Sequence, residues 1–255
     1  MSWCDLFESR ESALCIGLDP VPDRLPAGLG SLAFCRHVID ATADYAACYK
    51  PNVAFFERNG PAGMEDYARL IEEIRQHGFP VIADVKRGDV ASTSEAYAAA
   101  YFGGPFDADA ITVNPSVGLD AIEPFRAAAS ELGRGVLLLL RTSNPGAAPF
   151  QEAAEPHLID AIGGDATYGA VVGATDPETG ARLRAALPDT FFLVPGFGAQ
   201  GGGDLEVFFD ARGRGAVVNA SRSIIYAEKG EGDWQNRVHH AAEAAHARIE
   251  QARKR

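Results

Sequence analysis

Short apolar runs alternate with longer mixed runs along most of the chain. Several of the short runs are apolar at nearly every position, as expected for strands that are buried on both faces. The predicted strands are Leu14–Asp19, Ala47–Val53, Pro80–Lys86, Ala110–Asn114, Val136–Arg141, Gly169–Gly173, Phe191–Pro195 and Ala216–Ala220. The stretches between and after them, rich in Ala, Glu and Arg, predict helices over Ser31–Ala46, Met64–Gln76, Ser92–Tyr101, Leu119–Glu131, Pro177–Ala186, Leu205–Asp210 and Trp234–Arg253.

Eight predicted strands with interleaved helices indicate the fold class. At a length of 255 residues this alternation is typical of an α/β protein that forms a (β/α)8 TIM barrel. A doubly wound open sheet would show the same alternation and remains the structural alternative. No linker rich in Pro or Ser and no shift in composition divides the chain, so we expect a single barrel domain over residues 1–255.

The barrel hypothesis predicts where the chemistry lies. Active sites of such barrels are built from the C-terminal ends of the strands and the loops that follow them. Polar residues collect at these predicted positions: Asp19, Lys50, Asp84, Lys86, Asn114, Arg141 to Asn144, Gln200, Ser221 and Arg222. We therefore expect one site at this end of the barrel.

Composition narrows the possible partners and the compartment. The formal net charge of −12 argues against general affinity for nucleic acid. No apolar run approaches the roughly 20 residues that span a bilayer, and the N-terminus shows no secretory signal. The four cysteines have spacings that match no zinc site. We expect a cytoplasmic protein with reduced thiols, no metal, and no nucleic-acid or membrane partner.

The most informative segment follows the start of the third predicted strand. Asp84 and Lys86 are two residues apart, so on a strand they point to the same face, which Ile82 shares. Asp89 lies just beyond the strand, and Lys50 lies near the end of the preceding strand. A structural ion-pair network at the barrel rim is one interpretation. A functional site is the other, because inward-facing charges gather where pKa values are tuned.

The charge pattern restricts what Lys86 can do. A lysine flanked by two carboxylates holds its proton. This suits a proton donor or an electrostatic stabiliser, whereas a Schiff-base nucleophile needs a neutral amine.

Two further segments indicate a phosphate site and a base site. The Gly-rich stretch from Pro195 to Gly203 carries Gln200, and Arg222 follows the eighth predicted strand. Barrels commonly hold a phosphate in these two places, although a plain flexible turn and a surface arginine would look the same. Ser143, after the fifth strand, could contact the edge of a base, or belong to an ordinary turn before Pro145.

The motif Asp84-x-Lys86-x-x-Asp89 resembles the signature of the orotidine 5′-phosphate decarboxylase family. Ala83 to Asp89 is similar to the form in the longer bacterial class of that family. The same spacing also resembles the sugar-phosphate decarboxylases and aldol-type synthases of the superfamily. Further segments are similar to the decarboxylase family in the expected order: Ile16 to Pro20, Lys50 to Phe56, Arg141 to Gly146, Leu193 to Gly203 and Asn219 to Ile224.

The resemblance implies an activity and a role for each residue. The activity would be that of a carboxy-lyase, which converts orotidine 5′-monophosphate to UMP in de novo pyrimidine biosynthesis without a cofactor. Lys86 would stabilise and protonate C6 of the ring, within a catalytic array that also contains Asp84, Asp89 and Lys50. The resemblance further implies that Asp19 and Lys50 bind ribose hydroxyls, that Ser143 contacts the pyrimidine, and that Gln200 and Arg222 bind the phosphate.

At Ser221 the chain departs from the residue usual in the family, and at Asp89 the resemblance implies a partner subunit. Family members often have glycine where this chain has Ser221, whose backbone N–H can still contact the substrate. In the family, the last aspartate of the motif reaches the active site of a neighbouring subunit. Here this residue is Asp89, with Thr93 as its companion, so the resemblance implies a homodimer with shared active sites.

Three rival functions remain open. A relative acting on a sugar phosphate through a metal-stabilised enediolate would lose activity with a chelator. A catalytically silent nucleotide-binding barrel would bind UMP without releasing CO2. A Schiff-base aldolase using Lys86 would be trapped by borohydride in the presence of substrate.

Overall fold

The computed structural model describes residues 2–198, 204–228 and 232–254. Within them, eight strands form one parallel sheet in the order β2-β1-β8-β7-β6-β5-β4-β3. Isolated parallel bridges from Tyr49 to Val81 and from Asn52 to Asp84 join the two end strands. The strands are β1 (Leu14–Leu18), β2 (Ala46–Pro51), β3 (Ile82–Arg87), β4 (Ala110–Val113), β5 (Gly135–Arg141), β6 (Tyr168–Val172), β7 (Phe192–Pro195) and β8 (Ala216–Ala220). The sheet closes on itself, so the predicted barrel is confirmed and the open-sheet alternative is wrong.

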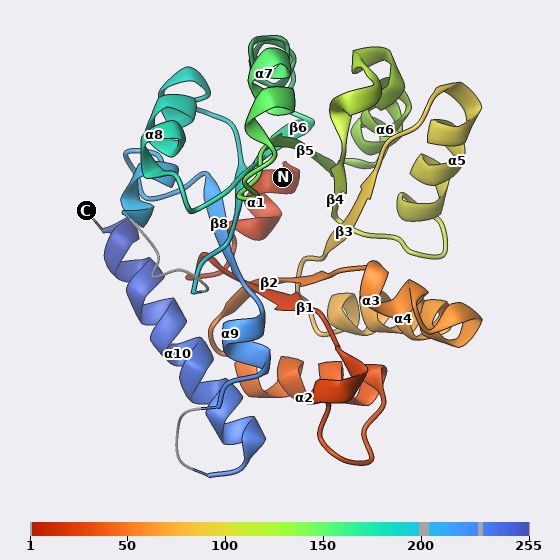
Figure 1. The fold of residues 1–255 in the computed structure, drawn as a ribbon, viewed down its shortest axis with the longest axis vertical. Coiled ribbons are helices and arrows are strands. Elements are labelled where there is room, and N and C mark those ends of the chain that lie inside the picture. The colour runs from red at the N-terminus through yellow and green to blue at the C-terminus, as the bar shows by residue number, and fades with distance from the viewer. Residues whose placement is uncertain (1, 199–203, 229–231, 255) are drawn as a thin grey trace.

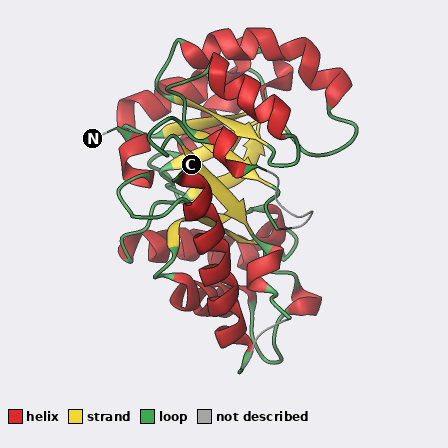
Figure 2. Cartoon of the chain, turned by 90° about the vertical axis from the view of Figure 1, so that its left-hand side faces the viewer, coloured by secondary structure: helices red, strands yellow, loops and turns green. Residues whose placement is uncertain are grey.

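Helices surround the strands on the outside of the barrel (Figures 1 and 2). The longer ones are α2 (Ser31–Thr42), α4 (Gly60–Gln76), α5 (Ala91–Tyr101), α6 (Leu119–Leu132), α7 (Ala148–Gly163), α8 (Pro177–Ala186) and α10 (Trp234–Arg253). The short ones are α1 (Trp3–Phe7), α3 (Ala54–Glu57) and α9 (Arg222–Ile225). Three 3-10 segments lie at Pro22–Arg24, Pro115–Val117 and Leu205–Phe208. No helix in the described part of the chain is both long and apolar enough to span a membrane.

The helices differ from the prediction in several places: α2 ends at Thr42 rather than at Ala46, and the short helices α1, α3 and α9 were not predicted. The helix α7 was not predicted, and α4 begins at Gly60 rather than at Met64 because Pro61 fits the first turn of a helix. The predicted helix Leu205–Asp210 is only a 3-10 segment that ends at Phe208. These differences lie outside the barrel wall, so they leave the placement of the strand ends unchanged.

The N-terminal end of the barrel is filled by the first helix. The side chains of Trp3 and Phe7 in α1 are buried in one cluster with residues that line the barrel interior. The Trp3 ring lies edge-on to Phe191 at 5.1 Å, and its Nε1 donates to the carbonyl of Ala166 at 2.8 Å. A Cβ atom on Gly135 would lie 2.5 Å from the Trp3 ring, so this strand start requires glycine. Because apolar side chains fill this end, polar chemistry is confined to the opposite end.

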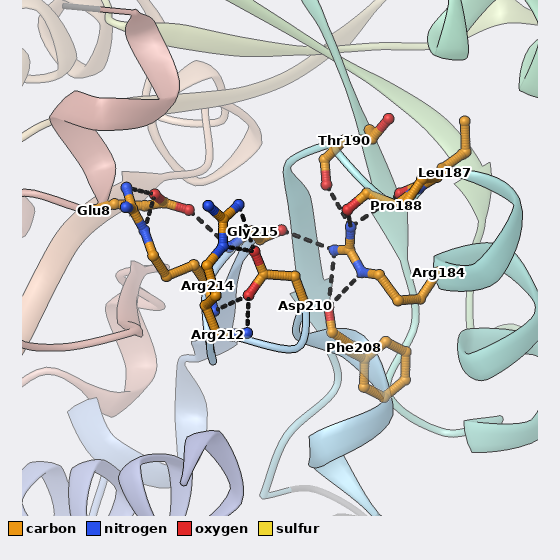
Figure 3. Close-up of polar contacts among 10 residues, drawn as sticks. All are labelled: Glu8, Arg184, Leu187, Pro188, Thr190, Phe208, Asp210, Arg212, Arg214 and Gly215. Carbon is orange, nitrogen blue, oxygen red and sulfur yellow. Dashed lines mark hydrogen bonds and ion pairs between the residues drawn. The ribbon is translucent and has the colours of Figure 1, made fainter. Parts of the chain in front are cut away.

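A buried arginine in α8 binds the segment that precedes β8 by hydrogen bonds (Figure 3). Arg184 in α8 is 8% exposed and donates only to backbone carbonyls, among them Phe208, Thr190 and Gly215. Its guanidinium also lies 3.7 Å from the centre of the Phe192 ring. Burial lowers the pKa of Arg184 to about 10, so the group stays charged at neutral pH. The planar guanidinium of Arg184 therefore connects α8 to the start of β7 and to the turn before β8.

Candidate active site

The structure places most of the predicted site residues at the C-terminal end of the barrel. Lys50 lies in β2, Asp84 and Lys86 lie in β3, and Asp19 follows β1 directly. Ser143 and Ser221 lie just after β5 and β8, and Arg222 begins α9. Gln200 lies outside the described residues. The strand ends therefore bring together residues that are up to about two hundred positions apart in the sequence.

Three charged side chains form a continuous chain across β2 and β3. The ammonium of Lys50 donates to Oδ2 of Asp84 at 2.6 Å, and the ammonium of Lys86 donates to Oδ1 of the same carboxylate. Lys50 and Asp84 are 5% and 7% exposed, whereas the side chain of Lys86 is 47% exposed. The buried ion pair of Lys50 and Asp84 is thus extended by the Lys86 ammonium, which solvent or a ligand can reach.

The protonation states follow from this arrangement. Burial by itself raises the pKa of Asp84, but the ammonium groups of Lys50 and Lys86 outweigh it and hold that pKa well below its ordinary value. Burial lowers the pKa of Lys50, and the carboxylates of Asp84 and Asp19 more than reverse this, so its pKa lies above the ordinary value. Asp84 is therefore a carboxylate and Lys50 an ammonium at neutral pH.

The reason that Lys86 reaches Asp84 differs from the one predicted. Regular strand alternation would suffice to put both side chains on one face, but β3 is irregular at this point. In the pairing of β3 with β4, Ala83 lies opposite Ile111 and Arg87 lies opposite Val113. The register therefore shifts between Ala83 and Arg87, which is a β-bulge in β3. Lys86 itself has φ of +47°, a left-handed conformation that is rare for a residue with a side chain. The direction of the Lys86 side chain is therefore set by the bulge and not by the regular alternation of side chains along a strand.

Asp19 lies at the end of β1 with one oxygen bound and one free. Its Oδ2 accepts from the hydroxyl of Ser221 at 2.5 Å. Its Oδ1 is buried and has no hydrogen-bond partner among the described residues. A buried carboxylate oxygen without a partner is costly, so this atom is a candidate for accepting a ligand hydroxyl.

Ser221 and Gly17 fit each other at this end of β1 and β8. A Cβ atom on Gly17 would lie 2.6 Å from the Cβ of Ser221, too close for both to be present without movement. The chain therefore accommodates Ser221 by having glycine opposite it on β1. The Ser221 hydroxyl orients Asp19, a role beyond the backbone contact expected from the sequence.

The loop after β7 approaches the start of α9. A Cβ atom on Gly198 would lie 2.6 Å from the hydroxyl oxygen of Ser223, so the two segments are in close contact. Arg222 is exposed beside this contact, and its side chain forms no hydrogen bond or ion pair with another described residue. The geometry thus leaves a cation accessible near Gly198, as expected for an anion site.

Ser143 is exposed at the end of β5, and its neighbours are held firmly. The backbone N–H of Thr142 donates to Oε1 of Gln151 at 3.0 Å, and Nε2 of Gln151 donates back to the Thr142 hydroxyl at 2.9 Å. Arg141 donates to Glu155 at 2.7 Å. Both partners lie on α7, so this helix orients the segment that presents Ser143.

Asp89 and Thr93 lie apart from the charged chain within a single subunit. The Asp89 carboxylate accepts from the backbone N–H of Val90 at 2.8 Å, and among the described residues it forms no hydrogen bond or ion pair with Lys86. Thr93 is exposed on the first turn of α5. The structure therefore groups Lys50, Asp84 and Lys86 and leaves Asp89 at their margin.

Sequence reasoning missed three polar residues that support this site. Thr112 in β4 donates to Oδ1 of Asp84 at 3.1 Å, and Asn52 donates to Oδ2 at 3.4 Å. Tyr226 donates to the backbone carbonyl of Asp19 at 3.0 Å and accepts from Val21 N–H at 2.5 Å. A hydroxyl in the otherwise apolar run Ala110–Val113 was the available signal for Thr112. Among the described residues, no group of three or more His, Cys, Asp or Glu side chains is placed to hold a metal ion.

Comparison with known proteins gives a consistent family. Residues 12–236 match the model of the orotidine 5′-phosphate decarboxylase / HUMPS family. The orotidine 5′-phosphate decarboxylase of Rhodopirellula baltica is 40% identical and covers 89% of this chain and 90% of its own length. That of Roseiflexus castenholzii is 43% identical over 87% of this chain and 86% of its own length. The structure of Leishmania donovani OMP decarboxylase superposes with a TM-score of 0.83 at 33% identity, with full coverage of both chains.

Proposed function

Because this chain belongs to the orotidine 5′-phosphate decarboxylase family, we propose that it converts orotidine 5′-monophosphate to UMP and CO2 with Lys86 as the proton donor. The observation that carries this role is the accessible ammonium of Lys86, which the buried carboxylate of Asp84 holds at the barrel mouth. The reaction is a step of pyrimidine biosynthesis.

The chemistry requires a fixed positive charge. Breaking the bond between C6 and the carboxyl carbon releases CO2 and leaves an electron pair on C6 in the plane of the ring, where the π system cannot delocalise it. A preorganised cation can stabilise such localised charge without reorganisation at the moment of reaction. The Lys86 ammonium supplies this charge, and then its proton forms the new C6–H bond, which leaves a neutral amine.

Asp84 and Lys50 prepare Lys86 for this step. The carboxylate of Asp84 orients the Lys86 ammonium, and the Lys50 ammonium pairs with the second oxygen of that carboxylate. A substrate carboxylate bound near Asp84 would experience repulsion between like charges. Departure as CO2 removes this repulsion, so the same carboxylate favours both the orientation of the donor and the loss of the leaving group.

The remaining side chains supply binding energy far from C6. Arg222 and Gln200 bind the phosphate, Ser143 contacts the pyrimidine, and the free oxygen of Asp19 accepts a ribose hydroxyl. Support for this assignment comes from the accessible guanidinium of Arg222 and the unpartnered Oδ1 of Asp19. Binding of the distant phosphate can hold the substrate in a strained encounter with Asp84, so it contributes to the rate of decarboxylation.

The first test is a direct assay of the purified protein. Mixing with orotidine 5′-monophosphate is expected to give an ultraviolet absorbance change and equal amounts of UMP and CO2, with or without a chelator. Loss of turnover with the chelator would instead favour a metal-dependent relative. UMP binding without CO2 release would favour a silent nucleotide-binding barrel.

We also infer that two copies of the chain share their active sites. Asp89 lies beside an exposed apolar residue, Val90, which is 52% exposed. Val117, in the 3-10 segment after β4, is 48% exposed, and Leu119, at the start of α6, is 44% exposed; β4 is the strand that neighbours β3. Exposed apolar side chains that gather on one face are typical of a surface that packs against a partner. A second copy on this face would bring its Asp89 and Thr93 toward the Lys86 of the first.

Mixing two inactive variants tests the sharing of sites. Lys86→Ala and Asp89→Ala are each expected to be nearly inactive. A mixed dimer of the two carries both substitutions in one site and none in the other, so random exchange of subunits should restore about a quarter of the wild-type activity. The assay is turnover after the two variants are unfolded and refolded together. If Asp89 acts in its own subunit, no activity returns.

The compartment is part of the same proposal. The four cysteines are unpaired, and three of them are buried. Free thiols persist in reducing compartments, so we place the enzyme in the cytoplasm. Labelling of the cysteines in protein taken from cells, under denaturing conditions and without reductant, should find all four as thiols.

A further inference from the structure

The backbone at Lys86 is strained and needs support. Four steps along β3, from Ala83 to Arg87, face only two steps along β4, from Ile111 to Val113. Within this bulge Lys86 adopts φ of +47°. A left-handed conformation is unfavourable for a residue with a Cβ atom and persists only when its surroundings impose it.

One buried hydroxyl provides the support. Thr112 in β4 is 1% exposed, and its Oγ1 accepts from the backbone N–H groups of Val85 at 2.9 Å and of Lys86 at 3.0 Å. The same hydroxyl donates to Oδ1 of Asp84 at 3.1 Å. A hydroxyl has one donor and two acceptor sites, so every hydrogen-bonding site of Thr112 is used within the bulge.

Through these three bonds, Thr112 is connected to the backbone of Lys86 directly and to the Lys86 ammonium by way of Asp84. Thr112 holds the backbone N–H of Lys86, and it also holds the oxygen of Asp84 that binds the Lys86 ammonium. Rotation of the Asp84 carboxylate or relaxation of the bulge would therefore break a bond to Thr112. Because Thr112 is β-branched and lies in a strand, its χ1 angle is restricted and the hydroxyl direction is fixed.

We propose that Thr112 is a positioning residue that sets the direction of the Lys86 ammonium before substrate binds. The proposal rests on the role of Lys86 as proton donor. Thr112 touches no reacting atom and acts through Asp84 and the backbone of β3. Without its hydroxyl, the buried N–H of Val85 and the partly buried N–H of Lys86 lose their acceptor, so the bulge relaxes and the ammonium moves away from C6.

The test compares Thr112→Val, which keeps the shape but removes the hydroxyl, with Thr112→Ser, which keeps the hydroxyl. Thr112→Val is expected to lower kcat by about 10- to 100-fold, the scale associated with misplacing a catalytic group by about 1 Å. The Kd for UMP should stay within about threefold of wild type. Hydrogen exchange of the Val85 and Lys86 amides should become faster. Thr112→Ser should keep kcat within about threefold and keep both amides protected.

Thr42 offers a matched control. It is fully buried in α2 away from the site, and its hydroxyl bonds to the carbonyl of Val38 at 2.8 Å and to the hydroxyl of Tyr49 at 3.0 Å. Thr42→Val should lower the free energy of unfolding without changing kcat. A fall in kcat that merely follows lost stability would appear in both valine variants and would overturn the proposal.

The outcomes separate this inference from the proposed function. If Lys86→Ala is inactive while Thr112→Val keeps the wild-type kcat, Thr112 has no positioning role and the role of Lys86 stands. Equal losses in Thr112→Val and Thr112→Ser would show that the hydroxyl is not responsible. If Lys86→Ala is active, the proposed role of Lys86 fails first. Should Thr112→Val not fold, Thr112→Ala carries the same comparison.

Discussion

Replacement of Lys86 by alanine is expected to lower kcat by at least about 10⁴-fold, because it removes both the cation that faces the ring anion and the proton that it receives. The Kd for UMP should change little, since the product has no carboxylate at C6 and its phosphate and ribose contacts remain. Turnover at saturating substrate and UMP binding by calorimetry measure the two quantities separately.

Lys254 provides a matched control for this substitution. It is an exposed lysine just after α10, far from the strand ends that form the site. Lys254→Ala should behave as wild type in both measurements. Turnover of Lys86→Ala within about tenfold of wild type would contradict the mechanism, because general acid catalysis alone contributes about 10²–10⁴-fold.

The second large effect concerns the phosphate. Arg222→Ala is expected to lower kcat/KM for orotidine 5′-monophosphate by about 100-fold, since charge-assisted hydrogen bonds contribute about 1.5–3 kcal/mol each. Decarboxylation of orotidine, which lacks the phosphate, should be nearly unaffected by the substitution. Steady-state kinetics with the two substrates give the comparison directly.

An exposed arginine that is near Arg222 in the sequence but lies outside the site serves as the control. Arg212 has a side chain that is 76% exposed and pairs with Asp210 in the turn before β8 (Figure 3). Arg212→Ala should leave both substrates unchanged, because exposed ion pairs contribute little. Equal losses for the two substrates in Arg222→Ala would show that this guanidinium does not bind the phosphate.

The predicted strands correspond closely to the observed ones because the signal is local. Strands buried on both faces need apolar side chains at consecutive positions, and Val136–Arg141 and Ala216–Ala220 show this directly. The helix α7 lacked an equally clear signal, since it contains Pro149 and Pro156. Proline usually ends a helix, but packing against β5 and β6 supports α7 in the folded chain.

The site was predictable where charge appears in an apolar strand. Asp84 and Lys86 interrupt a buried run, and burying a charge is costly without a partner, so their pairing could be expected from the sequence. The supporting contacts could not. Tyr226 reaches the Asp19 backbone across 207 positions and Trp3 reaches Ala166 across 163, and no local pattern indicates which distant atoms will meet.

The sequence alone determined the alternation of strands and helices, the strand ends that carry chemistry, and the identity of the charged residues, because strand burial and motif spacing are properties of neighbouring positions. The closure of the sheet into a barrel was decided by the pairing of β2 with β3. Only the tertiary structure decided how Lys86 is aimed. Its direction depends on a bulge whose register is set by β4 and whose unpaired N–H groups are satisfied by Thr112, 26 residues further along the chain. Hydrogen bonds between strands fix such angles, and they exist only once the strands have paired.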